Sequence, residues 1–278
     1  MGVFMRKQEF YSIGQVSKIA NLSTKALRYY DKIGLIQPDK VEDNQYRFYS
    51  MPTLLSVPVI KYYKQMGFKL EEMRSLIEGS TYNVLEKVFS DKIKQIKIEE
   101  RELFIKYKSV KDWHELILEA DGVIENNITN VFVKFLNTEE FTFLEQEFDY
   151  DYNSSIVNIE FTNFVEEKGT AVTGPVMLYF PSYKDKINNT AKNVKIVQRT
   201  FENVGEENSI KLGGSMVISC YHIGSHESIN QTYDKIIKWA NEGNHKLGDY
   251  CVERYVTDYW TTKNTNNFVT EIMIEMRK

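Results

Sequence analysis

The stretch CVERYVTDYW, residues 251–260, places a carboxylate among aromatic side chains. In a β-strand, Glu253 and Tyr255 would share one face and Arg254 would lie on the other. A carboxylate buried alone on such a face is costly. A hydrophobic cation would offset that cost through charge pairing and aromatic stacking. The stretch therefore favours a cation-binding pocket, although Glu253 could also be solvated or could pair with Arg254 or Arg199.

Glu253 also leaves room for two other interpretations. A carboxylate beside a tyrosine could perform acid–base chemistry in a hydrolase. That interpretation leaves the first half of the chain unexplained, so we expect no enzyme, no catalytic residue and no cofactor. The other alternative is a regulator that needs no ligand, in which apolar side chains fill the space behind Glu253.

A second stretch, STKALRYYDKIGL at residues 23–35, indicates a helix that contacts an anion. Ser23 can cap it, and Ser12 with Gln15 fits a capping box on a short helix just before it. The periodicity of the second helix separates an inward set from an outer set. The inward set is Ala26, Leu27, Tyr30 and Ile33, and the outer set is Lys25, Arg28 and Tyr29. Two short helices joined by a tight turn are typical of a helix-turn-helix, in which arginine contacts guanine or phosphate.

The residues after this helix predict a wing. PDKVEDNQYRFYS, residues 38–50, contains a turn at Asp43 and Asn44 and then a short strand. The charge distribution agrees, because residues 1–80 hold 12 Lys/Arg against 8 Asp/Glu, whereas residues 121–278 hold 15 against 23. A basic front and an acidic back suit a chain whose N-terminal part binds nucleic acid.

Residues 81–119 predict a long helix with a coiled-coil seam. Steps of four and three connect nine positions, of which seven are apolar or aromatic. They are Phe89, Ile93, Ile96, Glu100, Leu103, Tyr107, Val110, His114 and Ile117. We expect two copies of the chain to associate through this helix.

Metal, redox and membrane chemistry are not indicated. Cys220 and Cys251 are 31 positions apart, which suggests neither a disulfide framework nor a zinc site. His222 and His226 are expected to be solvated histidines rather than metal ligands. No apolar run of about 18 residues exists, and the N-terminus lacks the apolar core of a signal peptide, so we expect a cytoplasmic protein that does not contact membranes.

Residues 121–278 alternate strand and helix patterns in two halves, each with the order β-α-β-β. The first half adds a strand-like insertion, EFTFLEQEF, after its first strand NVFVKFL. The predicted fold class is therefore α+β. The expected domains are a winged helix-turn-helix in residues 1–80, a coiled-coil helix in residues 81–120 and a duplicated β-α-β-β domain in residues 121–278.

The front part resembles the MerR family of transcription regulators. The resemblance rests on YSIGQVSKIANLSTKALRYYDKIGLIQPD, YRFYS and MGFKLEEMRSLI. It implies a dimer that distorts promoter DNA, so that RNA polymerase engages both promoter elements. It also implies DNA contacts from the recognition helix, the wing and the helix after it. These residues are Ser23, Thr24, Lys25, Arg28, Tyr29, Tyr30, Tyr46, Arg47 and Lys64. Pro58 departs from an uninterrupted helix and predicts a kink or a late start near Val57, which leaves the placement of Lys61 and Lys64 open.

The back part resembles the gyrase-inhibitor-like effector-binding module of the multidrug-responsive BmrR type. This resemblance implies a central pocket for a small organic effector, in particular a lipophilic cation. Glu253 matches the pocket glutamate by position, and the other expected lining residues are Tyr221, Ile223, Tyr255 and Phe268. Ile223 stands where that type carries an aromatic residue, which implies a less aromatic cage and a different ligand.

Overall fold

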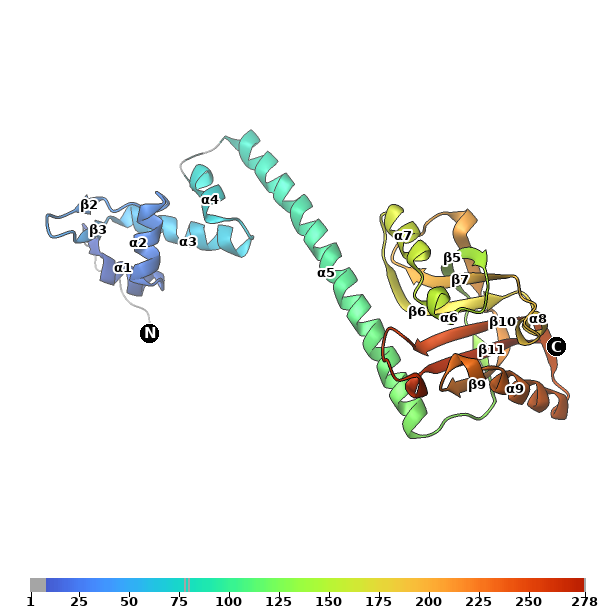
Figure 1. Cartoon of the computed structure of the whole chain (residues 1–278). Helices are drawn as coiled ribbons and strands as arrows, with labels where there is room; N and C mark the ends of the chain where they lie inside the picture. Colours follow the sequence, from blue (N-terminus) through green and yellow to red (C-terminus); the bar gives the residue numbers. More distant parts are fainter. Residues whose placement is uncertain (1–8, 78, 80, 278) are drawn as a thin grey trace. The chain divides into compact units, whose positions relative to one another are not determined.

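The computed structural model describes residues 9–77, 79 and 81–277 (Figure 1). They form two compact units, one up to Glu100 and one from Arg101 onward. Residues 1–8, on which the predicted absence of a signal peptide partly rests, lie outside the described residues. Within the described part of the chain, no helix is long and apolar enough to cross a membrane.

The first unit contains the predicted helix-turn-helix and wing. Its helices are α1 (Ile13–Ala20), α2 (Thr24–Lys32), α3 (Met51–Gln65) and α4 (Leu70–Ile77). Its strands are β1 (Tyr11–Ser12), β2 (Lys40–Val41) and β3 (Arg47–Tyr49), which form an antiparallel sheet in the order β1-β3-β2. The wing hairpin is visible as the loop that connects β2 and β3 in Figure 1.

Side-chain caps define where the first two helices begin. Ser12 and Gln15 exchange the reciprocal bonds of a capping box, with 2.8 Å from the Ser12 amide to the Gln15 amide oxygen. The Ser23 hydroxyl accepts from the Ala26 amide at 3.0 Å, which satisfies one free N–H of α2. Leu27 and Tyr30 then point into the core of this unit. The predicted caps are confirmed, and so is the inward placement of Leu27, Tyr30 and the partly buried Ile33, whereas Ala26 is half-buried outside this core.

Of the two alternatives predicted from Pro58, a kink or a late start of the helix α3, the late start is wrong. The helix begins at Met51, where the Ser50 hydroxyl accepts from the Thr53 amide, and it continues through Pro58 to Gln65. Leu54, Val57 and Ile60 are buried on either side of the proline. An interior proline removes a backbone hydrogen bond and destabilises a helix by about 3 kcal/mol. The packing of these three side chains offsets that cost.

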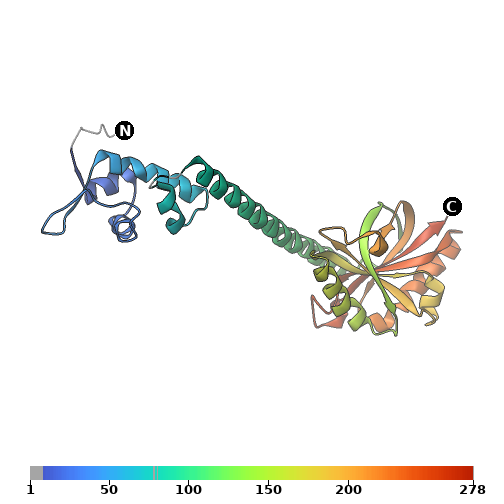
Figure 2. The same cartoon turned by 90° about the horizontal axis from the view of Figure 1, so that it is seen from above.

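α5 (Tyr82–Glu125) is a single helix of 44 residues, visible along its length in Figure 2. At 1.5 Å per residue it is about 66 Å long. Near its start, Leu85, Val88 and Phe89 pack on the core of the first unit. Near its end, Leu116, Ala120 and Val123 are buried against the sheet of the second unit. The helix therefore continues past the predicted boundary at residue 120.

Most of the predicted seam of α5 is uncovered in the single chain. Its exposed apolar or aromatic members have exposed fractions from 43% to 70%. They are Ile93, Ile96, Leu103, Tyr107, Val110 and Ile117. Water contact at six positions of one seam is unfavourable, and a second copy of the chain would remove it.

The second unit is built on one eight-stranded antiparallel sheet, in the order β4-β9-β11-β10-β6-β7-β5-β8. The strands are β4 (Phe132–Leu136), β5 (Glu139–Glu147), β6 (Val172–Phe180), β7 (Asn193–Thr200), β8 (Ser209–Leu212), β9 (Ser215–Ile223), β10 (Lys246–Thr257) and β11 (Val269–Arg277). The helices are α6 (Tyr152–Ile156), α7 (Ile159–Glu167), α8 (Tyr183–Ile187) and α9 (Asn230–Glu242). Short 3-10 turns are η1 (Glu206–Asn208), η2 (His226–Ser228) and η3 (Thr265–Asn267).

The β-α-β-β repeat is present, but its first strand differs from the prediction. β9 pairs with β11, and the strand that pairs with β7 in the equivalent way is β5. β4, which was expected to start the first half, lies instead at the sheet edge beside β9. The segment predicted as an insertion is therefore the repeated strand. The helical part of this half is divided into α6 and α7, because Asn158 caps a new start.

The register of the central strands decides which side chains share a face. Glu253 is opposite Leu178 on β6 and Ile272 on β11, so these three side chains lie on one face. That face is packed by α6, α7 and α9 through the main core cluster. The next residue, Arg254, is opposite Met177 and belongs to the other face, which α5 contacts. We call these the helix-covered face and the α5 face.

Candidate functional site

The outer surface of α2 holds the predicted DNA-reading side chains. Lys25, Arg28 and Tyr29 are exposed, and so are Ser23 and Thr24 at the start of the helix. Two cations and a tyrosine within one helical turn can contact phosphates and base edges in a major groove.

Tyr30 was predicted both to face inward and to contact DNA, and the structure places it inward. Only 3% of this residue is exposed, and it packs in the core of the first unit. Positions 27 and 30 are one turn apart on the same side of α2, so Leu27 and Tyr30 anchor the helix together. The ring of Tyr30 therefore supports the exposed side chains and is not available to a base.

The predicted wing residues are placed at the surface in two different ways. Tyr46 is 61% exposed at the end of the hairpin turn. Arg47 donates from Nε to Asp31 Oδ2 at 2.7 Å and thus connects the wing to α2. Lys64 is exposed near the end of α3, whereas Lys61 donates to the Ala20 carbonyl at 2.5 Å. The wing and the reading helix are therefore joined by an ion pair.

Glu253 lies on the helix-covered face and has no exposed surface. Its Oε1 accepts from the Tyr233 hydroxyl at 2.8 Å and its Oε2 from the Tyr255 hydroxyl at 2.5 Å. Burial raises the pKa of both tyrosines well above the usual range, so both stay protonated donors. Arg254 and Arg199, the arginine partners considered from sequence, line a cavity on the α5 face and do not pair with Glu253.

The positive charge beside Glu253 comes from Lys186 on α8. Its Nζ is 3.4 Å from Glu253 Oε1, and only 1% of the residue is exposed. Four aromatic rings surround this ammonium, with centroids 5.3–6.0 Å away. They belong to Tyr150, Tyr152, Phe180 and Tyr233. The chemistry expected for an external cation is thus supplied by the chain itself.

His226 completes this group, which we call the Glu253 cluster. The residue is 3% exposed, and its ring stacks on Phe268 with centroids 5.2 Å apart. Its two nitrogens have no hydrogen-bond partner among the described residues, and burial lowers its pKa to about 4. His222 is also buried, with its ring nitrogens bonded to the Thr232 hydroxyl and the Ser225 carbonyl. The prediction of two solvated histidines is therefore wrong, because His222 belongs to β9 and His226 packs on Tyr255 and Phe268.

The predicted effector residues do not form one site. Tyr255 and Phe268 belong with Glu253, since all three are buried on the helix-covered side. Tyr221 and Ile223 pack with the α5 cluster instead. Alternation along β9 explains the split, because Cys220 shares the row of Glu253 and the next residue must point the other way.

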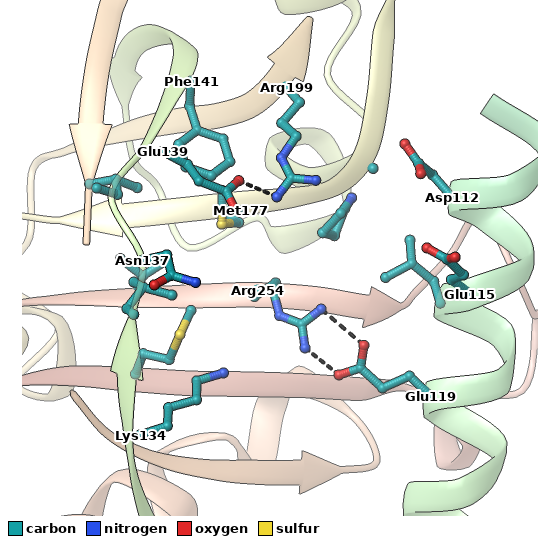
Figure 3. A pocket seen from close by; sticks show the side chains of 17 residues that line it. Asp112, Glu115, Glu119, Lys134, Asn137, Glu139, Phe141, Met177, Arg199 and Arg254 are labelled. Atoms are coloured by element: carbon teal, nitrogen blue, oxygen red, sulfur yellow. Dashed lines mark hydrogen bonds and ion pairs between the residues drawn. The ribbon is translucent and has the colours of Figure 1, made fainter. Parts of the chain in front are cut away.

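The α5 face carries a cavity of about 240 Å³, shown in Figure 3. One wall is α5, which presents Asp112, Glu115 and Glu119. The opposite side contributes Lys134, Arg199 and Arg254 from three strands. Apolar side chains complete the lining, among them Phe141, Met177, Val252 and Met273. The cavity can hold a small amphipathic molecule in contact with both the sheet and α5.

Arg254 connects the two walls of this cavity, as the dashed lines in Figure 3 show. It donates to both carboxylate oxygens of Glu119 and, at 2.8 Å, from Nε to Glu271. The Tyr221 hydroxyl also donates to Glu119, at 2.8 Å. Burial alone would raise the pKa of Glu271, but Arg254 and Lys134 hold it below its usual range. This network fixes the end of α5 to the sheet.

Lys186 is the functional residue that sequence reasoning missed. It lies in FPSYKDKINNT, between two predicted strands, and no element was assigned there. Ser182 caps α8 by accepting from the Asp185 amide at 3.1 Å, a pattern readable in principle from the sequence. Nothing in the residue types says which lysine turns inward. Within the described residues, no group of His, Cys, Asp and Glu could hold a metal ion.

Comparison with known proteins gives family matches for both units. The model of the MerR family regulatory protein matches residues 12–49. The model of the GyrI-like small molecule binding domain matches residues 132–277, which is more than half of the chain. The multidrug-efflux transporter 2 regulator of Bacillus subtilis (strain 168) is 22% identical over 276 residues, or 98% of each chain.

A second relative from the same organism matches only the front part. The multidrug-efflux transporter 1 regulator is 52% identical over 69 residues, which is 24% of this chain and 25% of the relative. Among solved structures, a cryo-EM EcmrR–DNA complex contains a chain that is 21% identical, with a TM-score of 0.47. That match covers 96% of this chain and 100% of the EcmrR chain. With both family models matched, the chain belongs to the MerR family of transcription regulators, in the form that carries a GyrI-like small-molecule-binding domain.

Proposed function

We propose that this regulator acts as a dimer that distorts promoter DNA for RNA polymerase and responds to a small organic effector bound in residues 101–278. The observation that carries the proposal is the double role of α5. Its first turns pack in the core of the first unit, and its last turns form one wall of the cavity on the α5 face of the second unit. A ligand at Glu253 would act on β10, whose next residue, Arg254, binds Glu119 of α5, so it has a physical route to the first unit.

Binding of DNA is supported by the exposed side chains of α2. The test is a titration of the DNA upstream of the protein's own gene at moderate salt. Arg28→Ala should weaken binding by at least about 1 kcal/mol, since the side chain would lose a base or phosphate contact. Lys238→Ala, which removes a positive charge from the exposed side of α9, is the matched control and should bind normally. Equal affinity of Arg28→Ala and wild type, with the fold intact by circular dichroism, would refute this role of α2.

Dimerisation is supported by the uncovered seam of α5. Lysines at both Ile96 and Leu103, which are 43% and 68% exposed in the single chain, should place charge in the seam and give monomers or aggregates. Gln95→Lys with Glu102→Lys adds lysines beside the same positions but off the seam, and should leave dimers. Sedimentation at micromolar concentration measures the outcome, and a dimeric seam variant would show that another surface holds the copies together.

We propose that the effector is a lipophilic cation. The support is chemical, because the Glu253 cluster is a carboxylate and four aromatic rings that already hold an ammonium. Calorimetry of the full chain with tetraphenylphosphonium and other lipophilic cations, against neutral molecules of the same shape, tests the class. Cations should bind at least about tenfold more tightly than their neutral counterparts.

A ligand-independent regulator is the second candidate, and one observation favours it. Glu253 is completely buried and its carboxylate is already partnered within the chain. If neither cations nor neutral molecules bind in calorimetry, and promoter binding is unaffected by them, this second candidate is the better description.

A further inference from the structure

The Glu253 cluster holds its ammonium in the manner of a ligand. Lys186 Nζ is 3.4 Å from the carboxylate, farther than the hydroxyls of Tyr233 and Tyr255, which are 2.8 and 2.5 Å away. The closest ring centroids, those of Tyr233 and Tyr152, are 5.3 and 5.4 Å from Nζ. Ring faces plus one carboxylate are how proteins recognise organic ammonium ions.

A second observation distinguishes this cluster from an ordinary buried ion pair. His226 is 3% exposed, and its ring lies tilted against Tyr152, one of the rings around the ammonium, with centroids 5.2 Å apart. Both of its ring nitrogens have no hydrogen-bond partner among the described residues. Buried polar atoms are normally paired. The cluster thus keeps the unpaired ring nitrogens of His226 beside its cation. Unpaired buried polar atoms are expected in a binding site and not in a hydrophobic core.

The cation is carried by a short helix with exposed side chains beside it. α8 has five residues and lies between β6 and β7. Its neighbouring side chains Lys184 and Asp185 are exposed, and the chain leaves the helix through Asn189 in the left-handed conformation. Tyr183 and Ile187 of α8 pack on the same core, so a displacement of α8 that removes Lys186 would also open space beside the carboxylate, while the sheet stays in place.

We propose that Lys186 is a tethered ligand: it occupies the cation site at Glu253, and an external lipophilic cation binds there only by displacing it. The inference rests on the proposed function for the class of effector. It makes Lys186 a residue that determines specificity. An external cation must gain more from the aromatic rings than the lysine does, which selects bulky aromatic cations over small amines.

The first experiment removes the ammonium of Lys186 by substitution and supplies a small ammonium ion in solution in its place. Lys186→Ala deletes three carbons and the nitrogen, which is the size of n-propylammonium. This ion should bind the variant at least tenfold more tightly than wild type and raise its melting temperature, whereas n-propanol should do neither. Lys184→Ala, on the exposed side of the same helix, is the matched control and should behave as wild type. Adding Glu253→Gln to Lys186→Ala should abolish the response.

Failure of the variant to fold also gives an answer. If Lys186→Ala folds only poorly, recovery of folded protein with n-propylammonium and not with n-propanol is the same positive result. A folded variant that n-propylammonium does not stabilise beyond wild type overturns the proposal, and so does an unfolded variant that the ion does not rescue.

The second experiment follows displacement in the wild-type protein. Reductive methylation read by mass spectrometry should leave Lys186 unmodified, because it is buried, and should modify Lys184. With saturating tetraphenylphosphonium, Lys186 should become modified at a rate close to that of Lys184. If the cation is bound but Lys186 stays protected, it binds elsewhere and the proposal fails, while the proposed cationic effector stands. If no lipophilic cation binds wild type, the effector class fails, and the n-propylammonium experiment still decides the role of Lys186.

Discussion

Two glutamates with no exposed surface lie on opposite faces of the same sheet, and their partners differ. On the α5 face, Glu271 pairs with Arg254 and Lys134, whose side chains are 18% and 33% exposed. On the helix-covered face, Glu253 pairs with one lysine, Lys186, that is as buried as itself. One carboxylate is neutralised by cations that reach a cavity, and the other by a cation enclosed among aromatic rings.

Both carboxylates are equally buried, so the two sites differ in the exposure of their partner cations. The site at Glu271 is open to the cavity, and the site at Glu253 is closed. Around Glu271, Arg254 also binds Glu119 of α5, so a ligand in the cavity can compete for charges that already connect two elements. Around Glu253, the ammonium and the carboxylate neutralise each other. A ligand there must replace Lys186 before it gains anything.

The largest expected effect comes from breaking the closed pair. Glu253→Gln leaves the buried ammonium of Lys186 without a counter-charge, which typically costs about 3–5 kcal/mol in the free energy of unfolding. Glu271→Gln should cost less, about 2 kcal/mol, because Lys134 is partly solvated and Arg254 keeps Glu119. Urea unfolding at fixed protein concentration, followed by circular dichroism, gives both values.

A paired change provides the control for that comparison. Adding Lys186→Met to Glu253→Gln removes the stranded charge and should recover most of the loss, since neutral replacements of a buried pair are often tolerated. A larger cost for Glu271→Gln than for Glu253→Gln would contradict the distinction between the two faces.

Much of this architecture could be predicted because it depends on local patterns. Ser12, Gln15 and Ser23 cap their helices through bonds within three residues, and the exposed side of α2 follows from helical periodicity. Alternation along β10 correctly separated Glu253 from Arg254. These features need no knowledge of distant partners.

The site could be predicted only in part, because it depends on strand register and on an unassigned loop. Tyr221 and Ile223 lie on β9, which pairs with the neighbour of the strand that carries Glu253. Their side chains point to the other face of the sheet, and only the register of β9 and β11 reveals this. Lys186 reaches Glu253 across 67 positions of sequence, from a helix with no strong pattern. The role of β5 likewise depended on its pairing with β7 and not on its own sequence.

A smaller loss of stability should appear at acidic pH, and it comes from the helix-covered face. His226 has a pKa lowered by burial to about 4, against about 6.5 when unfolded, so the unfolded chain takes up its proton first. Stability is therefore lost as pH falls from 6.5 towards 4, by roughly 3 kcal/mol from this residue. His226→Phe keeps a ring for stacking and should flatten that part of the profile. Unfolding free energies of both proteins at pH 7, 5.5 and 4.5 measure it, and parallel profiles would mean that other groups cause the acid loss.

The smallest effect is expected on the α5 face, where the end of α5 is bonded to the sheet. Glu119→Gln weakens charge-assisted bonds to Arg254 but leaves that arginine paired with Glu271, so the cost should be about 1 kcal/mol. The loss should be local, because Leu116, Ala120 and Val123 still pack on the sheet. Hydrogen exchange should therefore speed up in the last turns of α5 and not in the Glu253 cluster. Glu115→Gln, one turn earlier and 58% exposed, is the matched control and should leave exchange unchanged. Equal effects of the two variants would mean that apolar packing alone holds α5 to the sheet, and that the Arg254 network does not connect the cavity to the helix.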